Sequence, residues 1–148
     1  PSLKYVAQFA CFCDDFLKND PQNAEYYVQS NMHFTEYTQS LLDEAKGINL
    51  QEGYVPCNHF WLVNSDSVIV GVIRIRHHID NEFLSLEGGH IGYDIAPSYR
   101  GRGNGKLMLN LALVKAKQLG ITKSLLTADE DNLASRKVIE AMVESLKK

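Results

Sequence analysis

Three cysteines are too few and too poorly spaced for the common cysteine-based sites. Cys11, Cys13 and Cys57 are odd in number, and the sequence holds no Cys-x-x-Cys pair. Cys11 and Cys13 lie two positions apart in a predicted helix and therefore point to different faces. This pattern argues against a disulfide framework and against a metal site. It favours buried free thiols in a reducing, cytoplasmic setting.

Neither sign of charge dominates, and long apolar runs are missing. The formal net charge is −3, which gives no general attraction to nucleic acid or to an anionic membrane. No apolar run approaches the roughly 20 residues that a bilayer-spanning helix needs, and no signal-peptide pattern opens the sequence. With 148 residues and 45% hydrophobic content, the chain is expected to form one domain, residues 1–148, with its own core.

Hydrophobic spacing predicts alternating groups of helices and strands. The predicted helices cover residues 2–19, about 23–46, 107–119 and a last segment from Asn132. The predicted strands cover residues 57–64, 68–77, 90–96 and 123–128. The continuously apolar run from Val68 to Ile73 is typical of a central strand that is covered on both faces. The second helix carries an aromatic stripe that is expected in the core, with one side able to line a cleft: Tyr27, Phe34, Tyr37 and Leu41.

A glycine-rich stretch joins the strand predicted at 90–96 to the helix predicted at 107–119. It reads Ser98-Tyr-Arg-Gly-Arg-Gly-Asn-Gly-Lys-Leu-Met108. Glycines allow positive φ and leave no Cβ between the chain and a ligand. The first N–H groups of a helix lack internal partners, and the helix dipole adds positive potential. Such a turn can hold a phosphate or pyrophosphate, and the alternative is a glycine-rich connection without a ligand.

The spacing of the glycines excludes the two common nucleotide loops. A Walker loop needs Ser or Thr after Gly-Lys, but Leu107 follows Gly105-Lys106, and Arg100 stands where its first glycine belongs. The dinucleotide fingerprint needs its third glycine where Lys106 stands. A nucleotide-binding module is therefore disfavoured, and the pattern that remains is Arg100-x-x-Gly103-x-Gly105.

That pattern resembles the acyl-CoA pyrophosphate loop of the GNAT N-acetyltransferase superfamily. The resemblance extends from Gly89-His-Ile-Gly-Tyr through the loop to Asp131-Asn-Leu-Ala-Ser, and more loosely back to about Cys57. It implies an α/β (mixed α+β) fold, with a mixed β-sheet, helices on both faces and a V-shaped splay between two central parallel strands, residues 90–96 and 123–128. The family usually has a first strand and two last strands that the sequence lacks. We therefore expect either further residues in the full protein or a homodimer that completes the sheet.

The resemblance also implies which residues hold acetyl-CoA. Pantetheine would bind the backbone of one strand, the pyrophosphate would bind the N–H groups of residues 102–106, and two side chains of the last helix would contact both. The implied residues are Tyr93, Asp94, Ile95, Arg100, Gly101, Arg102, Gly103, Asn104, Gly105, Lys106, Asn132 and Ser135. No metal is implied.

Acetylation of a primary amine needs a base, because the amine carries a proton up to a pKa near ~10.4. His90 is the first candidate, since it begins a strand at the expected site and titrates near neutrality. Glu87 is the second, followed by Glu82 and His78; a base acting through water and a merely structural His90 are the alternatives. The family's usual acid is a tyrosine after the position of Asn132, and no tyrosine follows Tyr99, so the general acid is unassigned.

The sequence thus predicts an acetyl-CoA-dependent N-acetyltransferase that acts on the amine of a small molecule or peptide. The alternative is a non-catalytic acyl-CoA-binding module or sensor that has lost its acid. Neither nucleic acid nor a membrane is an expected partner. Acids near the expected mouth weakly favour a cationic acceptor: Glu52, Asp80, Glu82 and Glu87.

Overall fold

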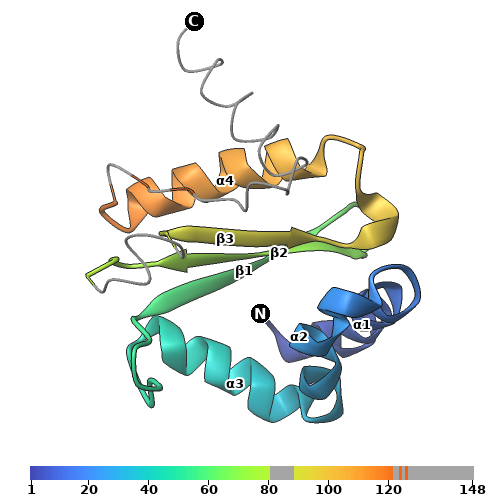
Figure 1. Ribbon diagram of the computed structural model, residues 1–148, viewed down its shortest axis with the longest axis horizontal. Helices are drawn as coiled ribbons and strands as arrows, with labels where there is room; N and C mark the ends of the chain where they lie inside the picture. Colours follow the sequence, from blue (N-terminus) through green and yellow to red (C-terminus); the bar gives the residue numbers. More distant parts are fainter. Residues whose placement is uncertain (81–88, 122–123, 125, 127–148) are drawn as a thin grey trace, which may run out of the picture.

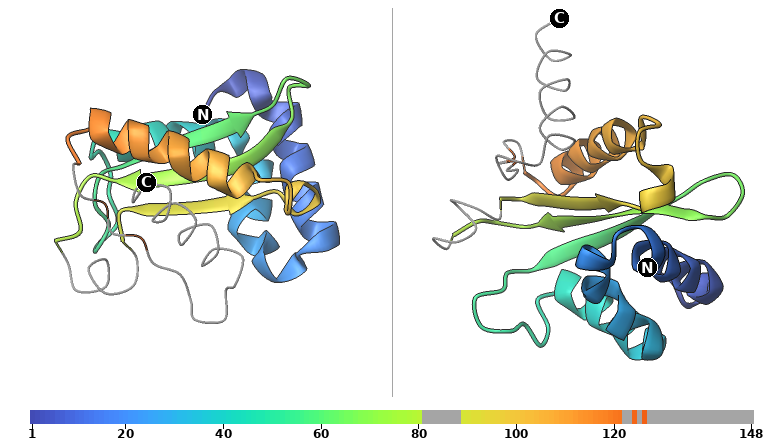
Figure 2. Two further views of the ribbon diagram at one scale, coloured as in Figure 1. Left: turned by 90° about the horizontal axis from the view of Figure 1, so that it is seen from above. Right: turned by 45° about the vertical axis from the view of Figure 1, so that its right-hand side comes forward.

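A three-stranded sheet separates two groups of helices in the computed structural model, which describes residues 1–80, 89–121, 124 and 126 (Figure 1). The strands are β1 (Cys57–Val63), β2 (Ile69–Arg76) and β3 (Ile91–Ile95). The helices are α1 (Val6–Asn19), α2 (Pro21–Met32), α3 (Phe34–Ala45) and α4 (Asn104–Gln118), with 3-10 turns η1 (Leu3–Tyr5) and η3 (Pro97–Tyr99). Helices α1 to α3 cover one face of the sheet and α4 covers the other, so the predicted mixed α+β class with helices on both faces is confirmed (Figure 2).

Strand β2 lies between β1 and β3 and pairs with both in the antiparallel direction. Its burial on both faces confirms the central strand that its apolar run predicts. The β1–β2 turn is closed by Asn64, whose side-chain oxygen accepts from the N–H groups of Asp66 and Val68, each at 3.0 Å. The strand predicted at 123–128 falls largely, and the helix predicted from Asn132 wholly, outside the described residues. The parallel pair and its splay therefore remain predictions.

The single helix predicted over residues 23–46 is wrong, because the chain forms α2 and α3 with a break at His33. His33 has φ −126° and ψ 52°, outside the helical region. A straight helix of this length would span about 36 Å and would carry one end of its aromatic stripe away from the sheet. The break instead lets Tyr27 and Phe34 enter the same core. Tertiary packing thus outweighs a continuous local preference for helix.

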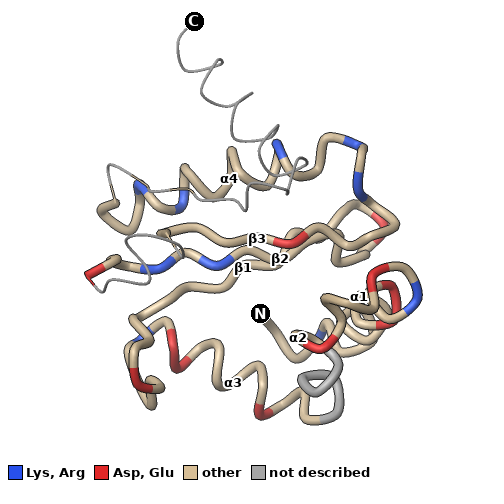
Figure 3. The backbone as a smooth tube through the Cα atoms, viewed as in Figure 1, with Lys and Arg blue, Asp and Glu red and all other residues tan. Residues whose placement is uncertain are grey.

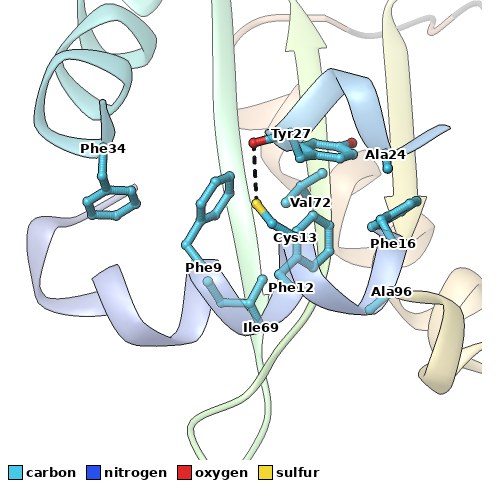
Figure 4. Close-up of a cluster of buried hydrophobic side chains, with 10 residues drawn as sticks. All are labelled: Phe9, Phe12, Cys13, Phe16, Ala24, Tyr27, Phe34, Ile69, Val72 and Ala96. Atoms are coloured by element: carbon cyan, nitrogen blue, oxygen red, sulfur yellow. Dashed lines mark hydrogen bonds between the residues drawn. The ribbon is translucent and has the colours of Figure 1, made fainter. Parts of the chain in front are cut away.

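Aromatic side chains from α1, α2 and α3 fill the space below the sheet (Figure 4). Phe9 lies at the centre, with its ring centroid 5.5 Å from that of Phe34 and 5.1 Å from that of Trp61. Cys13 donates from its thiol to the carbonyl oxygen of Tyr27 at 3.3 Å, which ties α1 to α2. Free, buried thiols are confirmed for Cys13 and Cys57 but not for Cys11, which lies on the exposed side of α1.

A second, aliphatic core lies between the sheet and α4. Met108, Leu109 and Ala112 of α4 are buried against Ile73 and Ile95. This packing fixes the N-terminus of α4 beside the end of β3 (Figure 1). Within the described residues, no helix combines the length and the apolar character that crossing a membrane requires.

Candidate functional site

The glycine-rich loop turns β3 into α4 through two glycines with positive φ. Gly101 has φ 73° and Gly103 has φ 81°, a conformation that other residues adopt only with strain. A Cβ built at either position would meet nothing within 4 Å, so the space beside the loop is open. The helix begins at Asn104 rather than at the predicted Leu107. Gly105 therefore lies in the first turn of α4. Only Gly101 and Gly103 of this loop have positive φ.

The N-terminus of α4 presents main-chain N–H groups to this open space. The helical ladder begins with the hydrogen bond from Leu107 N–H to the carbonyl oxygen of Gly103, at 3.1 Å. The amides of Asn104, Gly105 and Lys106 therefore have no acceptor inside the helix. Basic residues surround this end of α4 (Figure 3). One of them, Arg102, lies over the Tyr99 ring with its guanidinium carbon 5.2 Å from the centroid. Dipole and side chains together make the corner suited to an anion.

Arg100 bonds to two other parts of the protein, although 47% of its side chain is exposed. Its Nε donates to the carbonyl oxygen of Ile95 at 3.1 Å, and a terminal nitrogen donates to Asp20 at 2.9 Å. Asp15 accepts from both the N–H (3.0 Å) and the hydroxyl (2.7 Å) of Ser98. These bonds fasten the loop to the α1–α2 corner. Asp15 and Asp20 were missed by the sequence analysis because each meets its partner across about 80 residues, and no local pattern marks such a contact.

Alternate main-chain groups of β3 face away from β2. The bonds from Arg76 N–H to the carbonyl oxygen of His90 and from Ala96 N–H to that of Val70 place the even-numbered residues toward β2. Tyr93 and Ile95 therefore direct their main-chain groups to the opposite edge, the edge expected to take pantetheine. Asp94 directs its main chain to β2 and its side chain toward α2. Among the three strand residues implied as cofactor contacts, Tyr93 and Ile95 thus direct their main-chain groups to that edge, where the carbonyl oxygen of Ile95 already accepts from Arg100 Nε.

A pocket of about 680 Å³ lies between the sheet and helices α2 and α3, within the usual range for small-molecule sites. Its floor comes from all three strands and its walls from the helices and the segment before β1. Aromatic rings and charged groups share the lining. The lining residues are Asn23, Tyr26, Tyr27, Tyr37, Leu41, Glu44, Gly53, Tyr54, Val55, Cys57, His59, Trp61, Val72, Arg74, Arg76 and Asp94.

Arg74 and Asp94 form an ion pair on the floor of this pocket. Arg74 NH1 lies 3.4 Å from Asp94 Oδ2, and Tyr27 donates its hydroxyl to the same carboxylate oxygen. The side chains keep 32% and 35% of their surface accessible because they line the pocket. Burial, followed by the neighbouring Asp94 charge, raises the pKa of the Tyr27 hydroxyl. Tyr27 therefore stays protonated and holds the carboxylate as a hydrogen-bond donor.

A second polar cluster, made of Glu44, Cys57 and His59, lies in the same pocket. His59 Nε2 lies 3.0 Å from Glu44 Oε2, and ligand atoms of all three residues lie within 4.8 Å of one another. Burial, with the Glu44 charge next, raises the pKa of the Cys57 thiol to about 12. The thiol is consequently protonated at neutral pH, whereas metal binding needs the thiolate. Among the described residues, this trio is the one group of three His, Cys, Asp or Glu side chains whose ligand atoms lie close enough together to hold a metal ion. The sequence did not predict a metal site here.

Two candidate bases lie within the described residues: His90 directly precedes β3, and His78 follows β2. Burial, followed by the charge of His78, lowers the pKa of His90, so His90 is neutral at pH 7 and able to accept a proton. His78 Nδ1 lies 3.1 Å from Asp80 in an exposed pair. Glu82, Glu87, Asn132 and Ser135 lie outside the described residues.

Comparison with known proteins adds one finding to this geometry. Neither the curated proteins nor the solved structures gave a significant match. A family model described as the acetyltransferase (GNAT) family matches residues 22–142, a span that includes α2, α3, the whole sheet, the glycine-rich loop and α4. The chain therefore belongs to the GNAT acetyltransferase family.

Proposed function

We propose that this protein is an acetyl-CoA-dependent N-acetyltransferase that acetylates a primary amine of a small molecule or peptide by direct attack in a ternary complex. The family supports acyl transfer from an acyl-CoA. The observation that carries the proposal is the junction of β3 and α4. There, two glycines in positive φ bring the first N–H groups of a helix to an open corner, next to a strand edge.

The residues of this junction fit the two polar parts of coenzyme A. Its pyrophosphate would be held by the N–H groups of residues 102–106, where the helix dipole and the charges of Arg102 and Lys106 favour an anion. Its pantetheine amides would pair with the main-chain groups of Tyr93 and Ile95, as another strand would. In this assignment Arg100 does not bind the pyrophosphate with its side chain. It holds the loop in place, because its guanidinium donates to the carbonyl oxygen of Ile95 and to Asp20. Asn132 and Ser135 remain proposed contacts.

The chemistry requires a neutral amine beside the thioester. The amine nitrogen forms a bond to the acetyl carbon, the carbon–sulfur bond breaks, one amine proton passes to a base, and coenzyme A leaves as the thiol after gaining a proton. His90 is the proposed base, since its lowered pKa keeps it neutral at pH 7. Glu87 is the second candidate. The acid that protonates the sulfur is unassigned.

Release of free coenzyme A from acetyl-CoA, measured with a panel of amines, amino acids and peptides, tests the transfer. We expect turnover with at least one acceptor. Binding of acetyl-CoA without turnover of any acceptor would instead support the non-catalytic acyl-CoA-binding module.

The cofactor loop is tested separately by thermal unfolding with and without acetyl-CoA. At a hundredfold excess over its dissociation constant, acetyl-CoA should stabilise the fold by about 2.7 kcal/mol, a rise in Tm of roughly 5–11 °C. Gly103→Val should abolish this rise. Gly120→Val is the matched control: Gly120 also has positive φ and open space around it, but it lies at the far end of α4. A full rise in folded Gly103→Val, or an equal rise with NAD, would overturn the assignment of the loop.

A further inference from the structure

Opposite charges lie side by side on the floor of the pocket between the sheet and α2 and α3. Arg74 on β2 and Asp94 on β3 are separated by 3.4 Å between NH1 and Oδ2. A guanidinium prefers a carboxylate, and a carboxylate prefers an ammonium group. The two groups together are complementary to a ligand that carries an ammonium and a carboxylate close together.

The guanidinium of Arg74 has donors to spare. An arginine offers five N–H donors, and Arg74 uses only part of them, for Asp94 at 3.4 Å and for the Tyr27 hydroxyl. It lies against Gly92, where an added Cβ would come within 3.0 Å of NH2 and 3.2 Å of Nε. The absence of a side chain at Gly92 therefore lets the guanidinium lie across β3. Because 32% of the Arg74 side chain stays accessible in the pocket, its remaining donors are within reach of a ligand.

We propose that this pocket binds the acceptor as a free α-amino acid, with its carboxylate on Arg74 and its ammonium on Asp94. In an α-amino acid one carbon separates the ammonium group from the carboxylate. This short separation fits Arg74 and Asp94, which lie close together on adjacent strands. Tyr27 holds the Asp94 carboxylate through its hydroxyl, on the same oxygen that Arg74 contacts. Val72 and Trp61, which pair across β2 and β1 on the same floor, offer an apolar surface to the amino-acid side chain.

This inference rests on the proposed acetyl transfer, and it names the product as an N-acetyl amino acid. The α-ammonium group first gives one proton to a base and becomes the neutral, nucleophilic amine. The nitrogen then bonds to the acetyl carbon and loses a second proton, the carbon–sulfur bond breaks, and coenzyme A leaves as the thiol after gaining a proton. Asp94 lies on β3, the strand whose other edge is proposed to take pantetheine. The ammonium group bound to Asp94 would therefore lie next to the strand that positions the thioester. Arg74 and Asp94 act as specificity-determining residues for the acceptor.

The pocket contains its own reporter, because Trp61 is the one tryptophan of the chain and lines the pocket. Its fluorescence is followed without acetyl-CoA while each proteinogenic amino acid except tryptophan is added. The amino acid that binds best is then compared with its amide, its decarboxylated amine and its N-acetyl derivative. We expect each of the three analogues to bind at least about tenfold more weakly, because each lacks one of the charged groups.

Three variants complete the test. Arg74→Gln should remove the preference for the amino acid over its amide, and in turnover it should raise KM for the amino acid while leaving the decarboxylated amine unaffected. Gly92→Ala retains every charge but displaces the guanidinium, so it should weaken binding in the same direction even if Arg74→Gln folds poorly. Lys18→Gln on the exposed side of α1 removes one positive charge away from the pocket and should bind like the parent protein.

The outcomes separate this inference from the proposed function. Coenzyme A release with simple amines, together with no amino-acid binding or with equal binding of the amide, would overturn the amino-acid site and leave the acetyl transfer. Amino-acid binding that depends on Arg74, together with no coenzyme A release for any acceptor, would support the site and overturn the transfer.

Discussion

The guanidinium of Arg100 donates to a carboxylate oxygen of Asp20 at 2.9 Å, across 80 residues of chain. The pair fastens the loop before α4 to the corner between α1 and α2. In the same contact region Ser98 binds Asp15, through both its N–H and its hydroxyl. The conformation of the glycine-rich loop thus depends on a helical segment that lies largely before the matched family region.

Asp20→Asn should weaken this attachment and lower the free energy of unfolding by about 1 kcal/mol at pH 7. The side-chain hydrogen bond from Asn23 and the contact with Arg100 lower the pKa of Asp20. The stabilisation is therefore present above the unfolded pKa, near ~3.9, and is lost as the pH falls through the lower folded value. Urea unfolding at pH 7 and near pH 2 measures the difference, which should disappear in acid. Asp66→Asn, in the exposed β1–β2 turn, is the control and should change little.

His90→Ala should lower kcat/KM about 100-fold or more if His90 is the base. The loss should shrink at high pH, where the amine is already neutral. In the parent protein, kcat/KM should rise with pH through a value below 6.5, because burial lowers the pKa of His90. His77→Ala is a matched control, since burial also lowers the pKa of His77. Glu87→Ala tests the second candidate, and a pH-independent loss of a few-fold in both His90→Ala and Glu87→Ala would exclude both as bases.

The three cysteines should differ sharply in reactivity. Cys11 is exposed, whereas Cys13 and Cys57 are buried, and burial is the main cause that raises the pKa of each buried thiol to about 12. A disulfide reagent should modify one thiol quickly in the folded protein and all three after unfolding. Cys11→Ser should abolish the fast phase, and fast reaction of two or three thiols would contradict the burial.

The same thiols predict a loss of stability in alkali. A group with a raised folded pKa contributes its full stabilisation below its unfolded pKa, near ~8.5 for cysteine. That stabilisation falls as the pH rises toward 12, at up to about 1.4 kcal/mol per pH unit and thiol. Denaturant unfolding between about pH 8 and pH 10.5 checks this decline. Cys13→Ala should reduce the slope, whereas Cys11→Ser should leave it unchanged.

Gly71→Val should destabilise the contact between the sheet and α4. A Cβ at Gly71 would lie 2.8 Å from Cε of Met108 and 3.0 Å from Cδ1 of Ile95. Because these atoms are the ends of flexible side chains, we expect a moderate cost of about 1–3 kcal/mol. A double-mutant cycle with Met108→Ala measures the coupling. The cost of Gly71→Val should fall in the Met108→Ala background, and an unchanged cost would show that Met108 is not the group displaced.

Local patterns in the sequence determined the element types, the central position of β2 and the glycine-rich turn into α4. These features follow from period, apolar content and turn chemistry, which act between residues close in sequence. The helix break at His33 was decided by the tertiary structure, because Tyr27 and Phe34 both gain burial in one aromatic core. The Arg100–Asp20 and Arg74–Asp94 pairs depend likewise on residues that the fold brings together from 80 and 20 positions away. Contacts at such separations leave no periodic or local signature in a single sequence, so the glycine-rich loop could be predicted from the sequence whereas the pocket between the sheet and helices α2 and α3 could not.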